Sequence, residues 1–330
     1  MEISVVAAAR EDGRPVEEAV RSAVLADRLG YGEVWLGEGP TWDAFVLATA
    51  VGSATERIAL TAGPVPVSVR DAATVVRGAA GVEAVTGRAV GVALGTSSVR
   101  VVEGVHGRSR ATPVGDLRAV ARAWVAHRRG EWFGARDDHG FRPRMKPATG
   151  PLTVAAFGDK AIAVAARYAD RMLLDLVTVE QVRELRAKLD AAAARDGRPA
   201  PRLAAWLPAA VDPDDASYAQ LMRAVVGYFP VRGYREVFQR AGFGGAIELA
   251  ERGADLDDVL AALPEHAART VGLVGDLDAV RSRLAEYAAA GLDEVAVVPA
   301  TAGDPAGERT LTALAPLLGR LTTGRDGRRR

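Results

Sequence analysis

The stretch RAVGVALGTSS, residues 88–98, shows most clearly the pattern of strand and turn from which the fold of the chain is predicted. Its first half alternates apolar with small residues, as a buried strand does, through Ala89, Val90, Val92 and Leu94. Its second half, Gly95 to Ser98, can turn the chain and offer backbone N–H and hydroxyl groups to an anion. Taken alone, these letters also describe an ordinary strand that ends in a polar turn. The anion-binding interpretation is favoured because a strand followed by small polar residues recurs along the chain.

Predicted strands and helices alternate along the chain. Strands are expected at 3–9, 33–36, 57–62, 88–94, 152–156, 171–176, 202–211 and 295–299, and a helix follows each. The first four repeat at about 25 to 30 residues, which is typical of parallel βα units. This alternation of strands and helices is interrupted by segments 99–150 and 213–268, which follow the fourth and seventh strands.

We therefore predict one α/β domain over residues 1–330, a (β/α)8 TIM barrel with two insertions and a frayed tail at 323–330. A doubly wound open sheet is the competing fold. No GxGxxG opens the first unit, and the barrel is therefore preferred.

Composition excludes several kinds of function. Lys+Arg and Asp+Glu are balanced at 42 each, so nothing indicates a nucleic-acid or membrane-surface partner. The absence of cysteine removes disulfides, thiolate nucleophiles and zinc–thiolate sites. The four histidines show no ligand spacing, so no metal is expected. With no export signal or membrane-length apolar run, we expect a cytoplasmic protein that acts on a small molecule.

In a barrel, the functional residues lie where the strands end. Glu38 is the lone acid after the second strand, where it could transfer a proton, although a solvated loop acid fits equally. Asp43 is interpreted as a helix cap. The expected substrate contacts are Trp42, Asp175 and Trp206.

Two further turns have local sequences that predict a cofactor contact. In Gly63-Pro64, proline directly after a strand favours a cis bond and a bulge toward a flat ring, the alternative being a trans proline that ends the strand. In the second turn, Gly158 at a strand end precedes a helix whose first N–H groups, with Lys160, could bind a phosphate. The alternative there is an ordinary turn capped by Asp159.

Five segments together resemble the luciferase-like flavin and deazaflavin oxidoreductases, in particular the coenzyme F420-dependent branch that includes methylenetetrahydromethanopterin reductase. They are GYGEVWLGEG at 30–39, TERIALTAGPVPVSVRDAATVV at 55–76, TGRAVGVALGTSSVRVVEGVHG at 86–107, PLTVAAFGDKAIAVAARYAD at 151–170 and GDLDAVRSRLAEYAAAGLDEVAVVP at 275–299. Their order and spacing match over nearly the whole chain.

The resemblance implies a (β/α)8 barrel with the cofactor ring at the strand ends and a cis-peptide bulge at Gly63-Pro64. It implies Glu38 as the acid beside the ring. The implied phosphate contacts are Ala93, Gly95, Thr96 and Ser97 after the fourth strand, and Gly158, Asp159 and Lys160 after the fifth.

Three positions depart from the family pattern. Gly39 stands where relatives often have a histidine proton donor, and Ala93 stands where glycine is usual. The first strand ends in Ala7-Ala8-Ala9, without the acid of some reductases in the branch. These departures concern catalysis more than cofactor binding.

Three functions follow as hypotheses. The first is a reductase in which reduced coenzyme F420 supplies a hydride to a C=N or C=C bond of a small organic substrate. The second is an FMN-dependent monooxygenase, and the third is a non-catalytic flavin-binding barrel, which the missing histidine allows. The turn at 95–98 and Gly63-Pro64 favour the first. A homodimer is expected, because relatives usually pair through barrel helices and the helices expected at 44–55 and 71–85 are rich in small residues.

Overall fold

The computed structural model describes residues 1–7, 15–39, 42–131, 146–231 and 233–319. The chain divides into two compact units. The first consists of Met1–Val5, Leu174–Ala187 and Leu203–Arg330, and the second of Val6–Leu173 and Lys188–Arg202. We call them the C-terminal unit and the N-terminal unit, after the part of the chain that supplies most of each.

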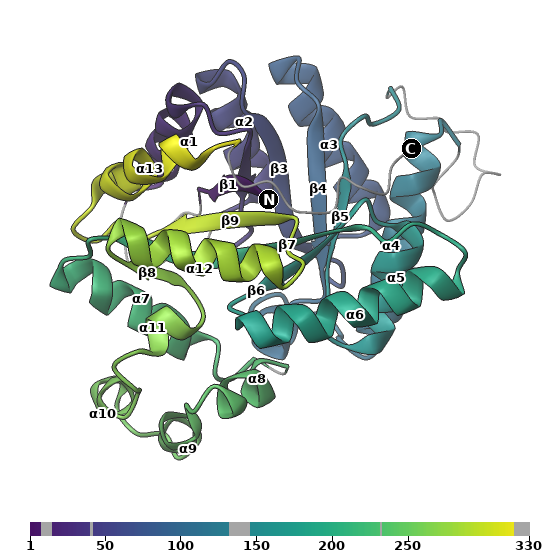
Figure 1. Cartoon of the computed structure of the whole chain (residues 1–330). Coiled ribbons are helices and arrows are strands. Elements are labelled where there is room, and N and C mark those ends of the chain that lie inside the picture. The colour runs from purple at the N-terminus through teal and green to yellow at the C-terminus, as the bar shows by residue number, and fades with distance from the viewer. Residues whose placement is uncertain (8–14, 40–41, 132–145, 232, 320–330) are drawn as a thin grey trace. The chain divides into compact units, whose positions relative to one another are not determined.

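The N-terminal unit holds parallel strands that pair in chain order. They are β2 (Glu33–Leu36), β3 (Ala59–Pro66), β4 (Val90–Gly95) and β5 (Leu152–Ala155), and β5 pairs further with the start of β6 (Arg171–Asp175). Helices connect them: α1 (Glu17–Leu29), α2 (Ala44–Ala54), α3 (Ala72–Thr86), α4 (Pro113–Arg128) and α5 (Asp159–Tyr168). In Figure 1, β3 and β4 lie side by side, and α3 runs beside them.

The ends of these helices follow from their capping residues. Asp43 and Asp71 accept hydrogen bonds from first-turn amides of α2 and α3, which satisfies donors that have no partner within the helix. Gly30 and Gly87 end α1 and α3 in the left-handed conformation, with φ of 87° and 71°, which glycine adopts without steric cost. The expected cap Asp43 is thereby confirmed.

The C-terminal unit contains β1 (Glu2–Val6), β9 (Glu294–Pro299), β7 (Arg202–Val211) and β8 (Leu273–Gly275), paired in parallel in that order. Buried Ser4 of β1 donates to the buried Glu294 carboxylate of β9 at 2.6 Å. Its helices are α12 (Leu277–Ala289), α13 (Glu308–Leu314) and the part of α6 (Val179–Arg195) that ends at Ala187.

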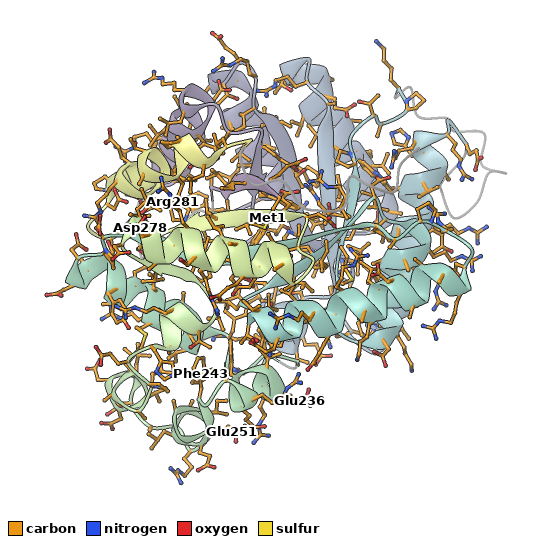
Figure 2. The ribbon with its side chains drawn as sticks, in the orientation of Figure 1. Met1, Glu236, Phe243, Glu251, Asp278 and Arg281 are labelled. Carbon is orange, nitrogen blue, oxygen red and sulfur yellow. The ribbon has the colours of Figure 1, made fainter. Side chains whose placement is uncertain are left out.

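The insertion after β7 is a group of short helices. They are α7 (Asp215–Gly227), α8 (Tyr234–Arg240), α9 (Gly244–Glu251), α10 (Leu256–Ala261) and α11 (Ala267–Thr270), which gather together in Figure 1. Fully buried Phe238 packs against Phe229 and Phe243, each with ring centroids 5.6 Å apart. Figure 2 labels Phe243 within this group and Glu251 at its outer edge. An aromatic core therefore holds these short helices together.

The predicted (β/α)8 class, with insertions after the fourth and seventh strands, is confirmed. Each of the eight predicted strands is present, although β3 extends to Pro66, beyond the expected end at 62. The prediction missed β8, which has only three residues and therefore shows no periodicity. It also missed a short π-helix, Arg100–Val105, after β4. The frayed tail lies outside the described residues, as do Ala8 and Ala9 of the first-strand run.

No helix among the residues that the structure describes is both long and apolar enough to cross a membrane.

A buried ion pair joins four strands of the N-terminal unit. Both terminal nitrogens of Arg171 (β6) donate to the two carboxylate oxygens of Glu33 (β2) at 2.7 Å. Arg171 Nε donates to Thr153 (β5) at 3.2 Å, and the Thr61 (β3) hydroxyl donates to Glu33 at 2.5 Å. The guanidinium lies 4.0 Å from the ring centroid of Trp35. This network fixes the relative register of β2, β3, β5 and β6.

Arg171→Met tests that network. It leaves the Glu33 carboxylate buried without its partner, so we expect the free energy of unfolding to fall by about 3 kcal/mol or more. Urea denaturation measures the change. The control is Arg281→Ala on the exposed Asp278–Arg281 pair of α12, which Figure 2 labels; an exposed pair of this kind contributes at most about 1 kcal/mol. Equal losses for the two variants would contradict the assigned role of Arg171.

Candidate functional site

The Gly63-Pro64 peptide is cis, as predicted. It lies inside β3, where the register with β4 shifts between Ala62 and Val65, so the predicted bulge is also present. Gly63 has a φ of 113°, and a Cβ added there would lie 2.3 Å from the carbonyl oxygen of Ala93. A Cβ added at Gly95 would lie 3.2 Å from Cβ of Pro64. The bulge is therefore packed directly on the end of β4.

The turn that follows β4 is held by an arginine that the sequence analysis did not single out. Arg110 Nε donates to the carbonyl oxygens of Thr96 and Ser97 at 3.1 and 3.0 Å, and its Nη2 donates to the Thr96 hydroxyl at 3.3 Å. Ser97 has a left-handed φ of 52°. Because a trans peptide places N–H opposite C=O, the amides of Ser97 and Ser98 point away from Arg110. Successive amides in such a turn form a concave anion site.

The turn after β5 lies at the same edge as the turn after β4. The two strands are parallel neighbours with Leu94 opposite Val154, and a Cβ added at Gly95 would lie 3.9 Å from Cβ of Ala155. Gly158 precedes α5, and a Cβ added to it would meet no atom within 4 Å. The space beside Gly158, where a side chain would lie, is therefore open. Both turns thus follow neighbouring strands at the same edge, and a single anion that reaches both stays a prediction.

Asp159 and Lys160 follow Gly158 in the first turn of α5, and both are exposed. The Asp159 carboxylate accepts a hydrogen bond from Lys188 at 2.9 Å, and this interaction lowers the pKa of Asp159. Lys188 thus counters the negative charge that would oppose an anion at this helix start.

Glu38 is engaged by the protein on both of its oxygens. Oε1 accepts from Arg70 Nε at 2.6 Å, and Oε2 accepts from the amide of Ala44 at 2.9 Å. Arg70 also donates to Asp43 and lies 5.5 Å from the ring centroid of Phe45. Burial opposes ionisation of Asp43, but Arg70 and two amides outweigh it, so the pKa of Asp43 is lowered. These contacts give Glu38 a capping function at α2, and proton transfer by Glu38 stays a prediction.

A second polar cluster lies in the C-terminal unit, at the end of β6. The Tyr234 hydroxyl donates to Asp175 Oδ2 at 3.1 Å, and Tyr228 also hydrogen-bonds this carboxylate. Burial raises the pKa of Asp175 to about 6, although both tyrosines favour the ionised form. The next residue, Leu176, has a left-handed φ of 49° and donates its amide to the carbonyl of Trp206 at 3.2 Å. Such a backbone is uncommon for a bulky residue and occurs preferentially at functional sites.

The structure brings the predicted site residues together in two sets. One lies in the N-terminal unit, at the ends of β2 to β5, and consists of Glu38, Trp42, Gly63, Pro64, Ala93, Gly95, Thr96, Ser97, Gly158, Asp159 and Lys160. The other, Asp175 and Trp206, lies in the C-terminal unit. Half-buried Trp42 follows β2, and its carbonyl accepts from the amide of Gly39.

Sequence reasoning missed four residues that position these sets: Arg70, Arg110, Tyr228 and Tyr234. Arg70 immediately precedes a helix cap after a strand, which is a signal that could have found it. Arg110 lies 13 and 14 residues from its partners, and no local spacing marks it. Within the described residues, no three His, Cys, Asp or Glu side chains are placed to hold a metal ion.

Gly63→Ala tests the packing of the β3 bulge. The added methyl group meets the Ala93 carbonyl oxygen at a backbone conformation that alanine rarely adopts, so we expect a loss of about 3 kcal/mol or more in unfolding free energy. Gly81→Ala in α3 is the control, because its Cβ enters open space and should be neutral or stabilising by up to about 1 kcal/mol. A fully stable Gly63→Ala protein would show that the packing is not tight.

Asp175→Asn tests the buried carboxyl through the pH dependence of stability. The folded pKa of about 6 lies above the ordinary aspartate value of 3.8, so the wild type should lose stability between about pH 4 and 6. A pKa raised by this amount corresponds to about 3 kcal/mol. Relative to wild type, Asp175→Asn should therefore become more stable by up to this amount as pH rises to 7. The exposed Asp278→Asn is the control, and a pH-independent difference for Asp175→Asn would refute the raised pKa.

The chain is similar to several known proteins over nearly its whole length. A protein of Mycobacterium tuberculosis named as a coenzyme F420-dependent oxidoreductase is 24% identical over 334 residues, covering 91% of this chain and 95% of the relative.

Two solved structures share the fold over nearly the whole chain. The coenzyme F420-dependent tetrahydromethanopterin reductase of Methanopyrus kandleri has a TM-score of 0.69 at 14% identity, covering 96% of this chain and 98% of the other. The oxygenating constituent of 3,6-diketocamphane monooxygenase from Pseudomonas putida, in complex with FMN, has a TM-score of 0.68 at 14% identity, covering 97% and 98%. The model of the luciferase-like monooxygenase family matches residues 1–294. The chain thus belongs to the luciferase-like monooxygenase family, as its sequence motifs predicted, and its enzyme class is that of an oxidoreductase.

Proposed function

We propose that the protein is a reductase that uses reduced coenzyme F420 to reduce a C=N or C=C bond of a small organic substrate. The observation that carries the proposal is the shared edge of β4 and β5, where the turn of Thr96 to Ser98 and the start of α5 both present backbone amides. The family membership and the F420-dependent relatives support it.

The residues at this edge fit a cofactor that carries a phosphodiester. Arg110 orients the turn so that the amides of Ser97 and Ser98 can donate to phosphate oxygens. The open space over Gly158 would be filled by a side chain at that position and is free for a second anionic oxygen. When bound, the reduced deazaflavin supplies a hydride.

The bulge at Gly63-Pro64 provides a backbone surface beside this edge. It packs on Ala93 and Gly95, so a planar ring placed against it would meet main chain rather than flexible side chains. Arg70 and Glu38 fix the start of α2 through the contacts described above. The protein's contribution is then orientation, which lowers the barrier by holding the reactants in a productive geometry.

Charge beside the turn favours F420 over FMN. The segment after β4 carries exposed Arg100 and Arg108 together with Arg110. The one acid among them, Glu103, accepts a hydrogen bond from the amide of Arg110. F420 has an anionic tail beyond its phosphodiester, whereas FMN ends in its phosphate. A cationic strip that continues past the phosphate turn therefore suits the longer tail.

We further propose a cytoplasmic homodimer. The dimer is supported by the exposure of Val46 on α2 and Val85 on α3, at 67% and 69%, on two helices that pack against each other.

Cofactor titration tests the proposed function. Purified protein should bind F420 more tightly than FMN, measured by cofactor fluorescence. Gly158→Val should weaken F420 binding about tenfold or more, because the side chain occupies the approach to the α5 amides. It should leave the melting temperature unchanged, because no protein atom lies within 4 Å of the added Cβ.

Gly32→Val is the matched control, at an open glycine before the amino end of β2. It should retain F420 affinity. Tighter binding of FMN than F420 would support the monooxygenase alternative, and binding of neither would support a non-catalytic barrel. Unchanged F420 affinity in Gly158→Val would remove the assigned phosphate position.

A further inference from the structure

The start of α5 differs from the starts of four other helices in the place of its acidic residue. Helices α2, α3, α7 and α12 each begin with an aspartate N-cap whose side chain accepts a hydrogen bond from a first-turn amide. The N-cap of α5 is Gly158, which has no side chain that could do so. Its acid, Asp159, lies one position later, so the interpretation of Asp159 as the cap of this turn is wrong.

Two amides of this first turn have no acceptor among the residues that the structure describes. The amides of Ala161 and Ile162 donate to the carbonyl of Gly158 at 2.9 and 3.0 Å. The amides of Asp159 and Lys160 precede them and are the orphan donors that a helix start leaves. The proposed function assigns a phosphate to these donors. Because Asp159 would donate its own amide, its carboxylate lies only one short side chain away from the bound anion.

The carboxylate of Asp159 is paired with a counterion that lies on the protein surface. It accepts a hydrogen bond from Lys188 Nζ at 2.9 Å. This bond and the charge of Lys188 lower the pKa of Asp159, and the charge of Arg195 acts in the same direction, so the carboxylate is ionised at neutral pH. These residues all belong to the N-terminal unit. The Asp159 and Lys188 side chains are 79% and 52% exposed, so solvent weakens the pairing and Asp159 keeps part of its effect on other charges.

We propose that Asp159 is a specificity-determining residue that biases the phosphate position toward a phosphodiester and against a terminal phosphate. The inference rests on the proposed function, which places the cofactor phosphate at this helix start. A diester carries one negative charge, whereas a terminal phosphate carries about 1.5 to 2 near neutral pH. Asp159 repels that additional charge. The cofactor class that fits is one whose phosphate is esterified on both sides, as in F420, rather than one that ends in a phosphate, as FMN does.

The electrostatics of the helix start agree with this role. The amino end of a helix carries a partial positive charge of about half an elementary charge, which stabilises both a first-turn acid and a bound anion. Asp159 already uses part of this stabilisation, and exposed Lys160 adds attraction for any anion. Asp159 therefore limits how much negative charge the same helix start accepts. This selection acts on the phosphate itself and does not depend on the anionic tail of the cofactor.

Two synthetic probes isolate the charge of the phosphate. One is the 5′-phosphate of the F420 chromophore, which is a monoester, and the other is the methyl ester of that phosphate, which is a diester. Both have the same ring and lack the anionic tail. Their dissociation constants are measured by fluorescence with the full-length protein at about pH 8, where the monoester carries two charges. The quantity compared is the dissociation constant of the monoester divided by that of the diester.

This ratio should move in opposite directions when either partner of the ion pair is changed. Asp159→Asn removes the repulsion and should lower the ratio about threefold or more. Lys188→Met leaves the charge of Asp159 uncompensated and should raise the ratio by a similar factor. The double variant should return close to the wild-type ratio. Both shifts should shrink in about 0.5 M salt, because exposed charges are screened. A purely structural role of the pair would change the ratio in the same direction in both single variants.

Glu56→Gln is the matched control. Glu56 is an exposed acid of the same unit that precedes the amino end of β3, whereas the phosphate position lies where the strands end. The substitution changes the net charge of the protein by the same amount as Asp159→Asn. It should leave the ratio unchanged.

The outcomes separate the two proposals. If the wild type binds neither F420 nor either probe, the proposed function is overturned. If the wild type binds the probes and the ratio stays unchanged in Asp159→Asn and Lys188→Met, the specificity assignment alone is overturned. A ratio that moves in the same direction in both variants, or that moves equally in Glu56→Gln, also overturns that assignment.

Discussion

The ion pair between Glu33 and Arg171 is the constraint on which the N-terminal unit depends. Both groups are withdrawn from water, and such a pair is tolerated only when its geometry is good and its remaining hydrogen-bond capacity is used. The bidentate contact and the threonines of β3 and β5 meet both conditions. A slip of one residue in any of the strands would turn its polar side chain to the other face. The pair therefore sets the register that brings the strand ends to one edge.

At that edge, the candidate site is made mostly of backbone. The bulge at Gly63 is packed so closely on Ala93 that no side chain fits between them, and Arg110 turns two carbonyls so that the amides of Ser97 and Ser98 face away. Main-chain donors of this kind do not depend on particular side chains. Such a surface can keep its shape while the surrounding side chains vary.

Much of the fold could be predicted because it depends on local patterns. Alternating apolar residues located the eight strands, Asp43 located a helix cap, and Gly63-Pro64 located the bulge. The parts that escaped prediction depend on contacts between residues distant in sequence. Nothing near Glu38 indicates that Arg70, 32 residues later, occupies one of its oxygens. Likewise, nothing near Asp175 indicates that two tyrosines from the insertion after β7 hydrogen-bond its carboxylate.

The central claim is that the edge formed by β3, β4 and β5 binds a deazaflavin cofactor. A crystal structure of the full-length protein with F420 tests it most directly. We expect the phosphodiester within hydrogen-bond distance of the amides of Ser97, Ser98 or the first turn of α5, and the ring against Gly63-Pro64. Electron density for F420 elsewhere on the chain, or with its phosphodiester away from both turns, would contradict the account.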